Sequence, residues 1–302
     1  MPPRRVTYAD VFESWLAWCA ARARRPIAPG TTGSYRRHGR RLLADWGPRA
    51  IAATTGAAVE RWVADCRAAG LADATINRRL VVLRGLMRHA LRERRVRRLP
   101  CVVPHLDEPP TSERDRLSRE DTARLLAASD ADPDPAVRAL VRLFADAGLR
   151  RAEPCLIRGE NVTLAAGRRG CGWIRVPARS RRERPKARCA RDVPILTREL
   201  HEALAALDPR QGEPLVRGLR DGDSVRRRIA RAWRAALGTA PQPHRLRHGW
   251  ITDLLQAGEP AVNVMAWAGH RNLATTLRYT HAAGEPTARA RAALRRRPAE
   301  RR

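Results

Sequence analysis

The chain has 302 residues, and its apolar content of 43% excludes wholesale disorder. Sixty Lys and Arg residues against 31 Asp and Glu residues leave a net charge of +29. This surplus favours a polyanionic partner such as nucleic acid, through Coulomb attraction and the release of counterions from phosphates, although a basic ribosomal protein would share it. The length is sufficient for two domains of ordinary size.

Helical patterns, joined by short breaks, fill residues 7–98. The first three helices are expected over Ala9–Arg24, between a Pro29-Gly30 turn and Trp46, and from about Thr54 to Gly70. Gly70 suits the left-handed conformation that ends many helices, because it has no Cβ to clash with the backbone. These segments predict a helical N-terminal domain.

A fourth helix is expected to begin after Asp73, whose side chain is a good N-cap. Its apolar residues recur at steps of three and four, as on the buried face of a helix. They are Ile76, Leu80, Leu83, Met87 and Leu91. The other faces carry arginines, which either point into solvent or contact DNA. For DNA contact we single out Arg78, Arg79 and Arg84.

A proline-rich stretch then separates two domains, which we expect at 1–103 and 117–302 with a linker at 104–116. The second domain opens with Ser118, which resembles the start of a capping box, and a further helix runs from Pro135 to Gly148. Short strands are expected at Trp173–Val176 and Asp192–Ile195, around a very basic turn. Helices follow, and the last twenty residues form an Arg-rich tail. The protein is therefore predicted to be mainly α-helical.

Six scattered cysteines form no C-x-x-C pair and no metal-ligand spacing. No N-terminal segment resembles a signal peptide, and no apolar run approaches the length of a membrane span. We therefore expect a cytoplasmic protein with reduced thiols and no membrane partner.

Residues 243–256 predict a helix that begins at a proline and ends at Gly258. On it His244, Arg247 and His248 are neighbours at i, i+3 and i+4. Two histidines at this spacing can bind zinc, but no acidic residue accompanies them and an arginine between them repels a cation. This positive, hydrogen-bonding face suits a phosphate better.

Farther along lie Gly269-His270 and Tyr279, one of three tyrosines in the chain. The set now resembles the tyrosine recombinase, or phage integrase, family. Its boxes match His244-Arg245-Leu246-Arg247-His248, Gly269-His270, Tyr279 and, for the first arginine, Gly148-Leu149-Arg150-Arg151-Ala152-Glu153. The family's lysine, eight residues before a Pro-Leu pair, matches Lys186 before Pro194-Ile195, and the helix Thr75-Ile76-Asn77-Arg78 matches its N-terminal domain.

Lys186 is the only lysine of the chain, which is notable because a lysine can release its proton whereas arginine effectively never does. Two residues depart from the family pattern. Pro154 follows Glu153 where an aliphatic residue is usual, and we expect it in the first turn of a helix that begins near Arg150, where amide protons lack intrahelical partners. Ala268 replaces a common leucine before the Gly-His pair.

The resemblance implies a helical core-binding domain followed by a mostly helical catalytic domain with a small antiparallel sheet. It implies that Tyr279 attacks a DNA phosphodiester to give a 3′-phosphotyrosine, with Arg150, Arg247, His244 and His270 around the phosphate and Lys186 as general acid. His244 also accepts the tyrosine proton. No metal and no cofactor are implied.

The expected partners are double-stranded DNA recombination sites, four subunits on a Holliday junction, and an accessory recombinase or DNA-bending protein. Because the core-binding pattern starts at once, we expect a Xer-type or transposon-type bacterial enzyme at the nucleoid. Two alternatives remain open. One is a type IB topoisomerase, which uses similar residues to relax supercoils, and the other is a catalytically silent DNA-binding protein of the same fold.

Overall fold

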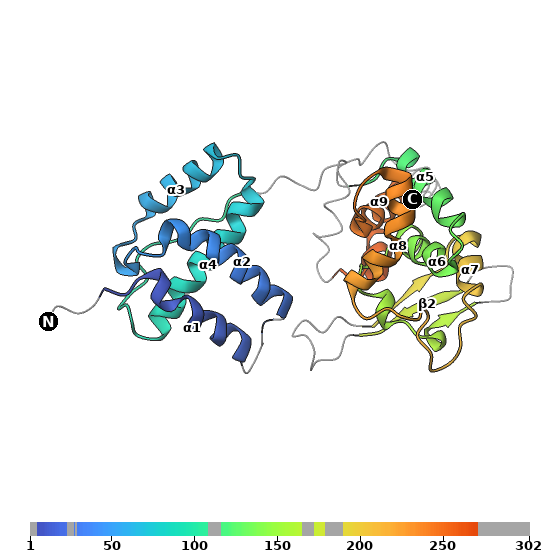
Figure 1. Ribbon diagram of the computed structural model, residues 1–302, viewed down its shortest axis with the longest axis horizontal. Coiled ribbons are helices and arrows are strands. Elements are labelled where there is room, and N and C mark those ends of the chain that lie inside the picture. The colour runs from blue at the N-terminus through green and yellow to red at the C-terminus, as the bar shows by residue number, and fades with distance from the viewer. Residues whose placement is uncertain are drawn as a thin grey trace, which may run out of the picture. The chain divides into compact units, whose positions relative to one another are not determined.

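A computed structural model describes residues 5–22, 27, 29–107, 116–164, 172–178 and 190–270 (Figure 1). The chain forms two compact units, one holding the described residues up to 107 and the other those from 116 onward. Lys186, Tyr279 and the Arg-rich tail lie outside the described residues. No helix in the described ranges is long and apolar enough to cross a membrane.

The N-terminal unit is a bundle of helices around an aromatic core. Its helices are α1 (Tyr8–Ala21), α2 (Pro29–Trp46), α3 (Gly56–Ala68) and α4 (Asp73–Arg92), with a short 3₁₀ turn at Ile51–Ala53. Helix α4 packs against α1, α2 and α3 (Figure 1). The ring of Trp46 meets Tyr8 edge-on at 5.7 Å and Trp62 at 6.2 Å, so the aromatic rings join three segments of the bundle.

Two predicted helix starts were wrong. Pro29 and Gly30 are the first residues of α2 and not a preceding turn, because proline needs no intrahelical hydrogen bond in the first turn. The N-cap of α4 is Ala72, and Asp73 is the first helical residue. Asp73 binds Arg67 through both carboxylate oxygens, at 2.8 and 2.9 Å, and this pair occupies the side chain that would otherwise cap the helix.

The predicted buried face of α4 is confirmed at Ile76, Leu80, Leu83 and Met87, and Leu91 is partly buried. The segment after α4 folds back on it. The side-chain amide of Asn77 donates to the carbonyl of Leu106 at 2.8 Å, and its oxygen accepts from the Leu106 amide at 2.9 Å. Arg84 donates to the carbonyls of Val103 and Pro104, both at 3.1 Å.

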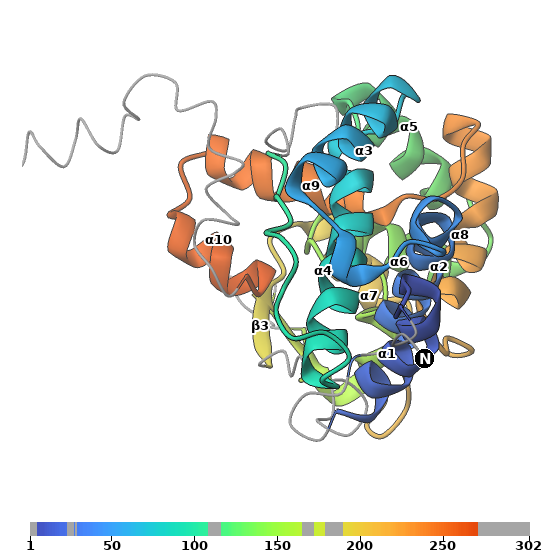
Figure 2. The same cartoon turned by 90° about the vertical axis from the view of Figure 1, so that its left-hand side faces the viewer.

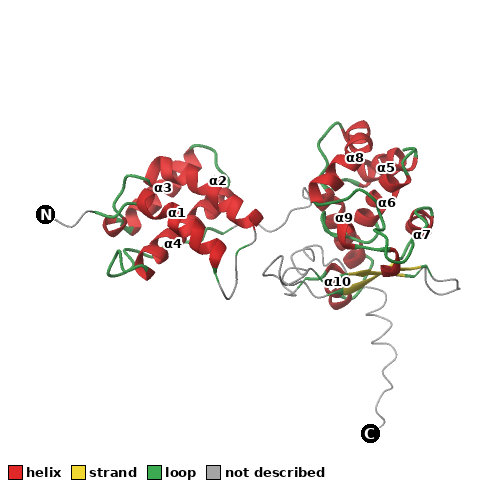
Figure 3. Ribbon diagram, turned by 60° about the horizontal axis from the view of Figure 1, so that its bottom comes forward, coloured by secondary structure: helices red, strands yellow, loops and turns green. Residues whose placement is uncertain are grey.

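The second unit combines helices with one small sheet. Its helices are α5 (Arg119–Asp130), α6 (Pro135–Ala145), α7 (Arg198–Ala205), α8 (Gly222–Leu237), α9 (Pro243–Gln256) and α10 (Ala261–Ala268), with 3₁₀ turns at Pro154–Leu156 and Gly159–Asn161. The strands β1 (Val162–Thr163), β2 (Trp173–Val176) and β3 (Arg191–Pro194) pair antiparallel in that order (Figure 3). The predicted strand at Trp173–Val176 is confirmed, and the second begins one residue earlier than predicted.

Packing in this unit brings the ends of α6, α9, α10 and β3 together. Helix α6 packs on α9, and α10 lies beside β3 (Figure 2). After α6 the chain turns at Gly148, whose φ is +58°. A Cβ there would overlap the Trp250 ring of α9, so glycine allows the following residue, Leu149, to be buried close to α9. After this turn, Arg150 points to the place where the ends of α6, α9, α10 and β3 meet.

Candidate active site

Arg150 lies in the turn between α6 and a 3₁₀ helix that begins at Pro154. The helix expected near Arg150 begins instead at Pro154, which is its first residue, and there the missing amide proton costs nothing. The carboxylate of Glu153 folds back on this turn. It accepts from the Arg150 backbone amide at 2.7 Å and from Arg150 Nη1 at 2.9 Å. The other arm, Nη2, donates to the carbonyl of Gly269 at 2.6 Å.

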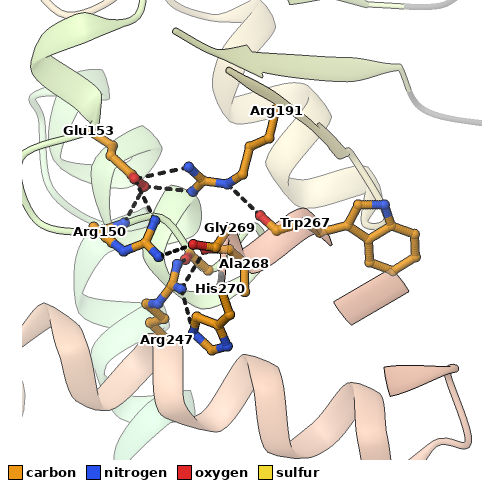
Figure 4. A network of polar contacts seen from close by, with 9 residues as sticks. Arg150, Glu153, Arg191, Arg247, Trp267, Ala268, Gly269 and His270 are labelled. Carbon is orange, nitrogen blue, oxygen red and sulfur yellow. Dashed lines mark hydrogen bonds and ion pairs between the residues drawn. The ribbon is translucent and has the colours of Figure 1, made fainter. Parts of the chain in front are cut away.

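Arg247 reaches the same place from α9, with a residue exposure of 4%. Its Nη2 donates to the carbonyl of Ala268 at 2.7 Å and lies 3.1 Å from Nε2 of His270. Its Nη1 donates to the carbonyl of Gly148. The two arginines of the sequence motifs thus meet at the end of α10, although they come from different segments of the chain (Figure 4).

A third arginine, Arg191 at the start of β3, was not singled out in the sequence. Its Nη1 and Nη2 bind the two carboxylate oxygens of Glu153 at 3.0 and 2.7 Å, and its Nε donates to the carbonyl of Trp267 at 2.6 Å (Figure 4). The Arg191 side chain is 8% exposed and that of Glu153 is 3% exposed. The available signal was an arginine placed directly before the predicted strand, but in so arginine-rich a chain it did not stand out.

The ionisation of Glu153 is fixed by its two arginines. Burial alone would raise the pKa of this carboxyl, but the hydrogen bonds and charge of Arg191, together with Arg150, lower the pKa to about 2. Glu153 is therefore negative throughout the physiological range. Its single negative charge is shared by Arg150 and Arg191, and Arg247 adds a third positive charge at the end of α10, so the site keeps a positive surplus.

Both motif histidines are held in the neutral form. Burial, followed by the positive charges of Arg247 and Arg150, lowers the pKa of His270 to about 4. His244, in the first turn of α9, keeps contact with solvent. Loss of part of its hydration and then the charge of Arg247 still lower the pKa of His244. A site with surplus positive charge and neutral, hydrogen-bonding imidazoles is suited to an anion.

Within the described ranges no three His, Cys, Asp or Glu side chains come together in a way that could hold a metal ion. The cations nearest His244, among them Arg247 and Arg150, also disfavour the zinc site considered for His244 and His248. The structure therefore brings together Arg150, His244, Arg247 and His270 from the predicted set. Lys186 and Tyr279 lie outside the described residues.

Comparison with known proteins agrees with this geometry. Residues 115–285 match the phage integrase family, and residues 18–94 match the phage integrase N-terminal SAM-like domain. The chain therefore belongs to the phage integrase family. It is a tyrosine recombinase, a site-specific enzyme that cuts and rejoins DNA strands.

Among its relatives is the tyrosine recombinase XerC of Azotobacter vinelandii, 31% identical over 86% of this chain and 88% of that protein. Two solved structures share the fold. One is the Tn1549 transposon integrase in complex with transposon right end DNA, with a TM-score of 0.66, 18% identity and coverage of 96% and 98%. The other is a lambda integrase tetramer bound to a Holliday junction, with a TM-score of 0.67, 17% identity and coverage of 92% and 78%.

Proposed function

We propose that this recombinase binds the phosphate to be cut between Arg150, Arg247, His244 and His270, and that Tyr279 attacks it. The observation that carries the proposal is the meeting of three arginines at the end of α10, where Arg150 and Arg191 bind the Glu153 carboxylate and Arg247 contacts His270. The transition state of the attack gathers negative charge on the non-bridging oxygens, and preorganised cations stabilise it most effectively where water is largely excluded. Arg247 is buried and most of Arg150 is covered, so both meet this requirement.

The contacts of Arg150 orient its guanidinium and leave some of its N–H donors available. A guanidinium carries five N–H donors, and the contacts of the Arg150 side chain with other described residues engage one donor on Nη1 and one on Nη2. Its remaining donors can take a phosphate oxygen. In the proposed reaction Tyr279 forms a 3′-phosphotyrosine, His244 accepts its proton, and Lys186 gives a proton to the departing 5′-oxygen.

The other two tyrosines are unsuited to this attack. The hydroxyl of Tyr8 is buried and pairs with Thr54 Oγ1 at 2.7 Å, and burial raises the pKa of Tyr8. The ring of Tyr35 stacks on Trp15 at 5.2 Å, and burial raises the pKa of Tyr35 as well. Both serve the core of the N-terminal unit, and this supports the choice of Tyr279.

For DNA contact the three arginines of α4 differ in their surroundings. Arg78 is exposed and Arg79 is half-buried. Burial, followed by the charges of nearby arginines that include Arg78 and Arg79, lowers the pKa of His38 on α2, so both arginines lie near this helix. Arg84 is engaged by the backbone after α4. We therefore assign direct phosphate contact to Arg78 first and to Arg79 second. Any contribution of Arg84 goes through the segment that it holds.

The proposed substrate is a pair of double-stranded recombination sites, joined by four subunits through a Holliday junction in the bacterial cytoplasm. The lambda integrase tetramer on a Holliday junction supports this assembly by its fold. An accessory recombinase or a DNA-bending protein is a further partner in the same proposal. The domain limits that we propose remain 1–103 and 117–302, with the linker between them.

The test begins with the end-labelled duplex that flanks the gene of this protein. Wild-type protein should become covalently attached at one position, which defines the mapped duplex. Tyr279→Phe should bind this duplex but form no adduct, whereas the matched variant Tyr35→Phe should form it. An adduct with Tyr279→Phe contradicts the proposal.

A second step separates recombination from topoisomerase-like relaxation. Supercoiled plasmids that carry one or two copies of the mapped duplex are incubated with the protein. Recombination requires two copies and yields deleted or inverted products. Relaxation of the one-copy plasmid without recombinant product on the two-copy plasmid would support the topoisomerase alternative instead.

A further inference from the structure

Three consecutive carbonyls at the end of α10 each accept a hydrogen bond from a different arginine. The carbonyl of Trp267 accepts from Arg191, that of Ala268 from Arg247, and that of Gly269 from Arg150, at 2.6, 2.7 and 2.6 Å. The last carbonyls of a helix lack intrahelical donors and carry the negative end of its dipole, so cations are favoured there. His270 follows directly, and its position depends on this turn (Figure 4).

The turn at the end of α10 is also tightly packed against two of these arginines. Gly269 ends α10 in the left-handed conformation, with φ at +65°. A Cβ on Gly269 would lie 3.0 Å from the Arg191 side chain and 3.2 Å from Arg150 Nη1. The backbone of α10 therefore lies directly against both arginines, and neither can move far while the other stays in place.

Arg191 differs from the other two arginines because it also holds the carboxylate that orients Arg150. Each oxygen of Glu153 receives one hydrogen bond from Arg191 and one from Arg150. The contact between Arg191 and Glu153 is bidentate, an arrangement that a lysine cannot reproduce. One side chain from β3 thus fixes both the guanidinium of Arg150 and the helix end that carries His270.

We infer that Arg191 is a positioning residue for strand cleavage. It holds Arg150, through Glu153, and the α10 turn in the geometry that receives the scissile phosphate. This inference rests on the proposed phosphate site. Its own guanidinium is directed at Glu153 and Trp267, so it acts through these groups and not on the reacting atoms. A displacement of about 1 Å in such a site can cost on the order of 100-fold in rate.

The alternative is an ion pair that merely stabilises the domain, and Arg142 on α6 provides the matched control. Its side chain is 11% exposed and binds Asp130 at 2.8 Å and Asp146 at 3.5 Å. Arg142 is therefore also a mostly covered arginine between two carboxylates, but none of these groups belongs to the phosphate site. Arg142→Gln should lower thermal stability without a specific effect on cleavage.

The experiment compares single-turnover adduct formation on the mapped duplex with that on the same duplex carrying a methylphosphonate at the cut position. The methylphosphonate lacks one anionic oxygen, so it depends less on how the arginines are oriented. Arg191→Gln should cleave the ordinary phosphate about 100-fold more slowly than wild type, with DNA affinity within about threefold of wild type. On the methylphosphonate the difference should shrink to less than about tenfold, as for Arg150→Ala. Arg191→Lys should fall between Arg191→Gln and wild type.

Three outcomes of the cleavage experiment overturn the inference. The first is a defect of Arg191→Gln that is equal on both substrates, and the second is the same substrate pattern in Arg142→Gln. The third is a wild-type cleavage rate in Arg191→Lys, because one ammonium group cannot bind both Glu153 and the Trp267 carbonyl as the guanidinium of Arg191 does. If Arg191→Gln does not fold, the cleavage rates of Arg191→Lys on the two substrates test the inference in its place.

A readout without DNA separates this inference from the proposed function. Arg191→Gln removes a positive charge near His270 and leaves Glu153 less compensated, so an NMR titration should show a higher pKa for His270, and Arg142→Gln should leave it unchanged. An unchanged His270 titration in Arg191→Gln overturns the inference even if the enzyme cuts DNA. A wild-type protein that forms no adduct on any DNA refutes the proposed function, whatever the titration shows.

Discussion

Nη2 of Arg247 lies 3.1 Å from Nε2 of His270. A guanidinium nitrogen can only donate, so Nε2 must accept, and the proton of the neutral ring is on Nδ1. Protonation of Nε2 would break this hydrogen bond and add a cation beside two arginines. This relationship accounts for much of the low pKa of His270, beyond the effect of burial.

We predict that His270 remains neutral in the free protein until the pH falls to about 4. Arg247→Gln should raise the pKa of His270, because it removes the nearest positive charge. Arg231→Gln, which breaks the ion pair between the exposed Arg231 of α8 and Asp132, is the control and should not alter the pKa of His270. An NMR titration of the histidine ring signals measures the values. A His270 that titrates near its ordinary pKa of about 6.5 would refute the geometry.

The same shift links His270 to stability. Its folded pKa lies below the unfolded value, so the unfolded chain takes up the proton first as the pH falls. Its contribution to the free energy of unfolding is therefore complete above about pH 6.5 and declines as the pH falls toward about 4.

Glu153→Gln should destabilise the catalytic domain by about 3–5 kcal/mol at pH 7, because two largely buried arginines lose their counter-charge. The carboxylate has a lowered pKa of about 2, so its stabilising effect is complete above its unfolded pKa of about 4.3 and is lost only as the pH falls toward about 2. Urea unfolding at several pH values measures the difference. Glu13→Gln breaks an exposed pair with Arg36 and should cost about 1 kcal/mol or less. Equal losses in the two variants would contradict the structure.

Elements with strong periodicity were predictable from the sequence, and those decided by tertiary contacts were not. The apolar spacing of α4 and the short segment Trp173–Val176 of β2 identified these elements. The start of α4 was misplaced because Asp73 can either cap a helix or pair with an arginine. The second choice depends on Arg67, at the end of another helix.

The same limit applies to the site. Arg150, Arg247, His244 and His270 stand in short motifs whose spacing could be read directly. Arg191 stands 38 positions from Glu153, and nothing local connects them. Only the approach of β3 to α10 shows that this arginine, among so many, belongs to the site.

For DNA binding we predict different effects of Arg78 and Arg84. The log of affinity should fall with the log of salt concentration by about 0.9 for each phosphate neutralised. Arg78→Ala should reduce this slope by about one contact, because its side chain is exposed. Arg84→Ala should mainly lower stability, because Arg84 binds two backbone carbonyls. Fluorescence anisotropy at a series of salt concentrations measures the slope for each variant. A reduced slope in Arg84→Ala and an unchanged slope in Arg78→Ala would assign the phosphate contact to Arg84 instead.

Cleavage should continue in EDTA, because arginines supply the charge stabilisation that metal ions provide in many other phosphoryl transferases. Adduct formation on the mapped duplex is measured with and without the chelator. If EDTA abolishes the adduct and added Mg²⁺ or Zn²⁺ restores it, the result would support a metal site at His244 and His248.

The last prediction concerns Lys186 as the proposed general acid. A 5′-alkoxide is a poor leaving group, and its departure needs a donor that can release a proton. Arginine, with a pKa above about 12, does this badly. Both Lys186→Ala and Lys186→Arg should therefore cut the ordinary phosphodiester more slowly, by a factor on the order of 10²–10⁴, the usual range for general acid–base catalysis. The Arg variant keeps the charge, so it separates proton donation from simple attraction to DNA.

Replacing the bridging 5′-oxygen by sulfur completes the test. The leaving thiolate has a parent pKa of about 8.5 and needs little protonation. Both Lys186 variants should then approach the wild-type rate on the sulfur substrate. Arg150→Ala should stay defective there, because stabilisation of the non-bridging oxygens is still required. If sulfur leaves the Lys186 variants slow, the lysine serves only as a charge toward DNA, and the proton for the 5′-oxygen comes from another group.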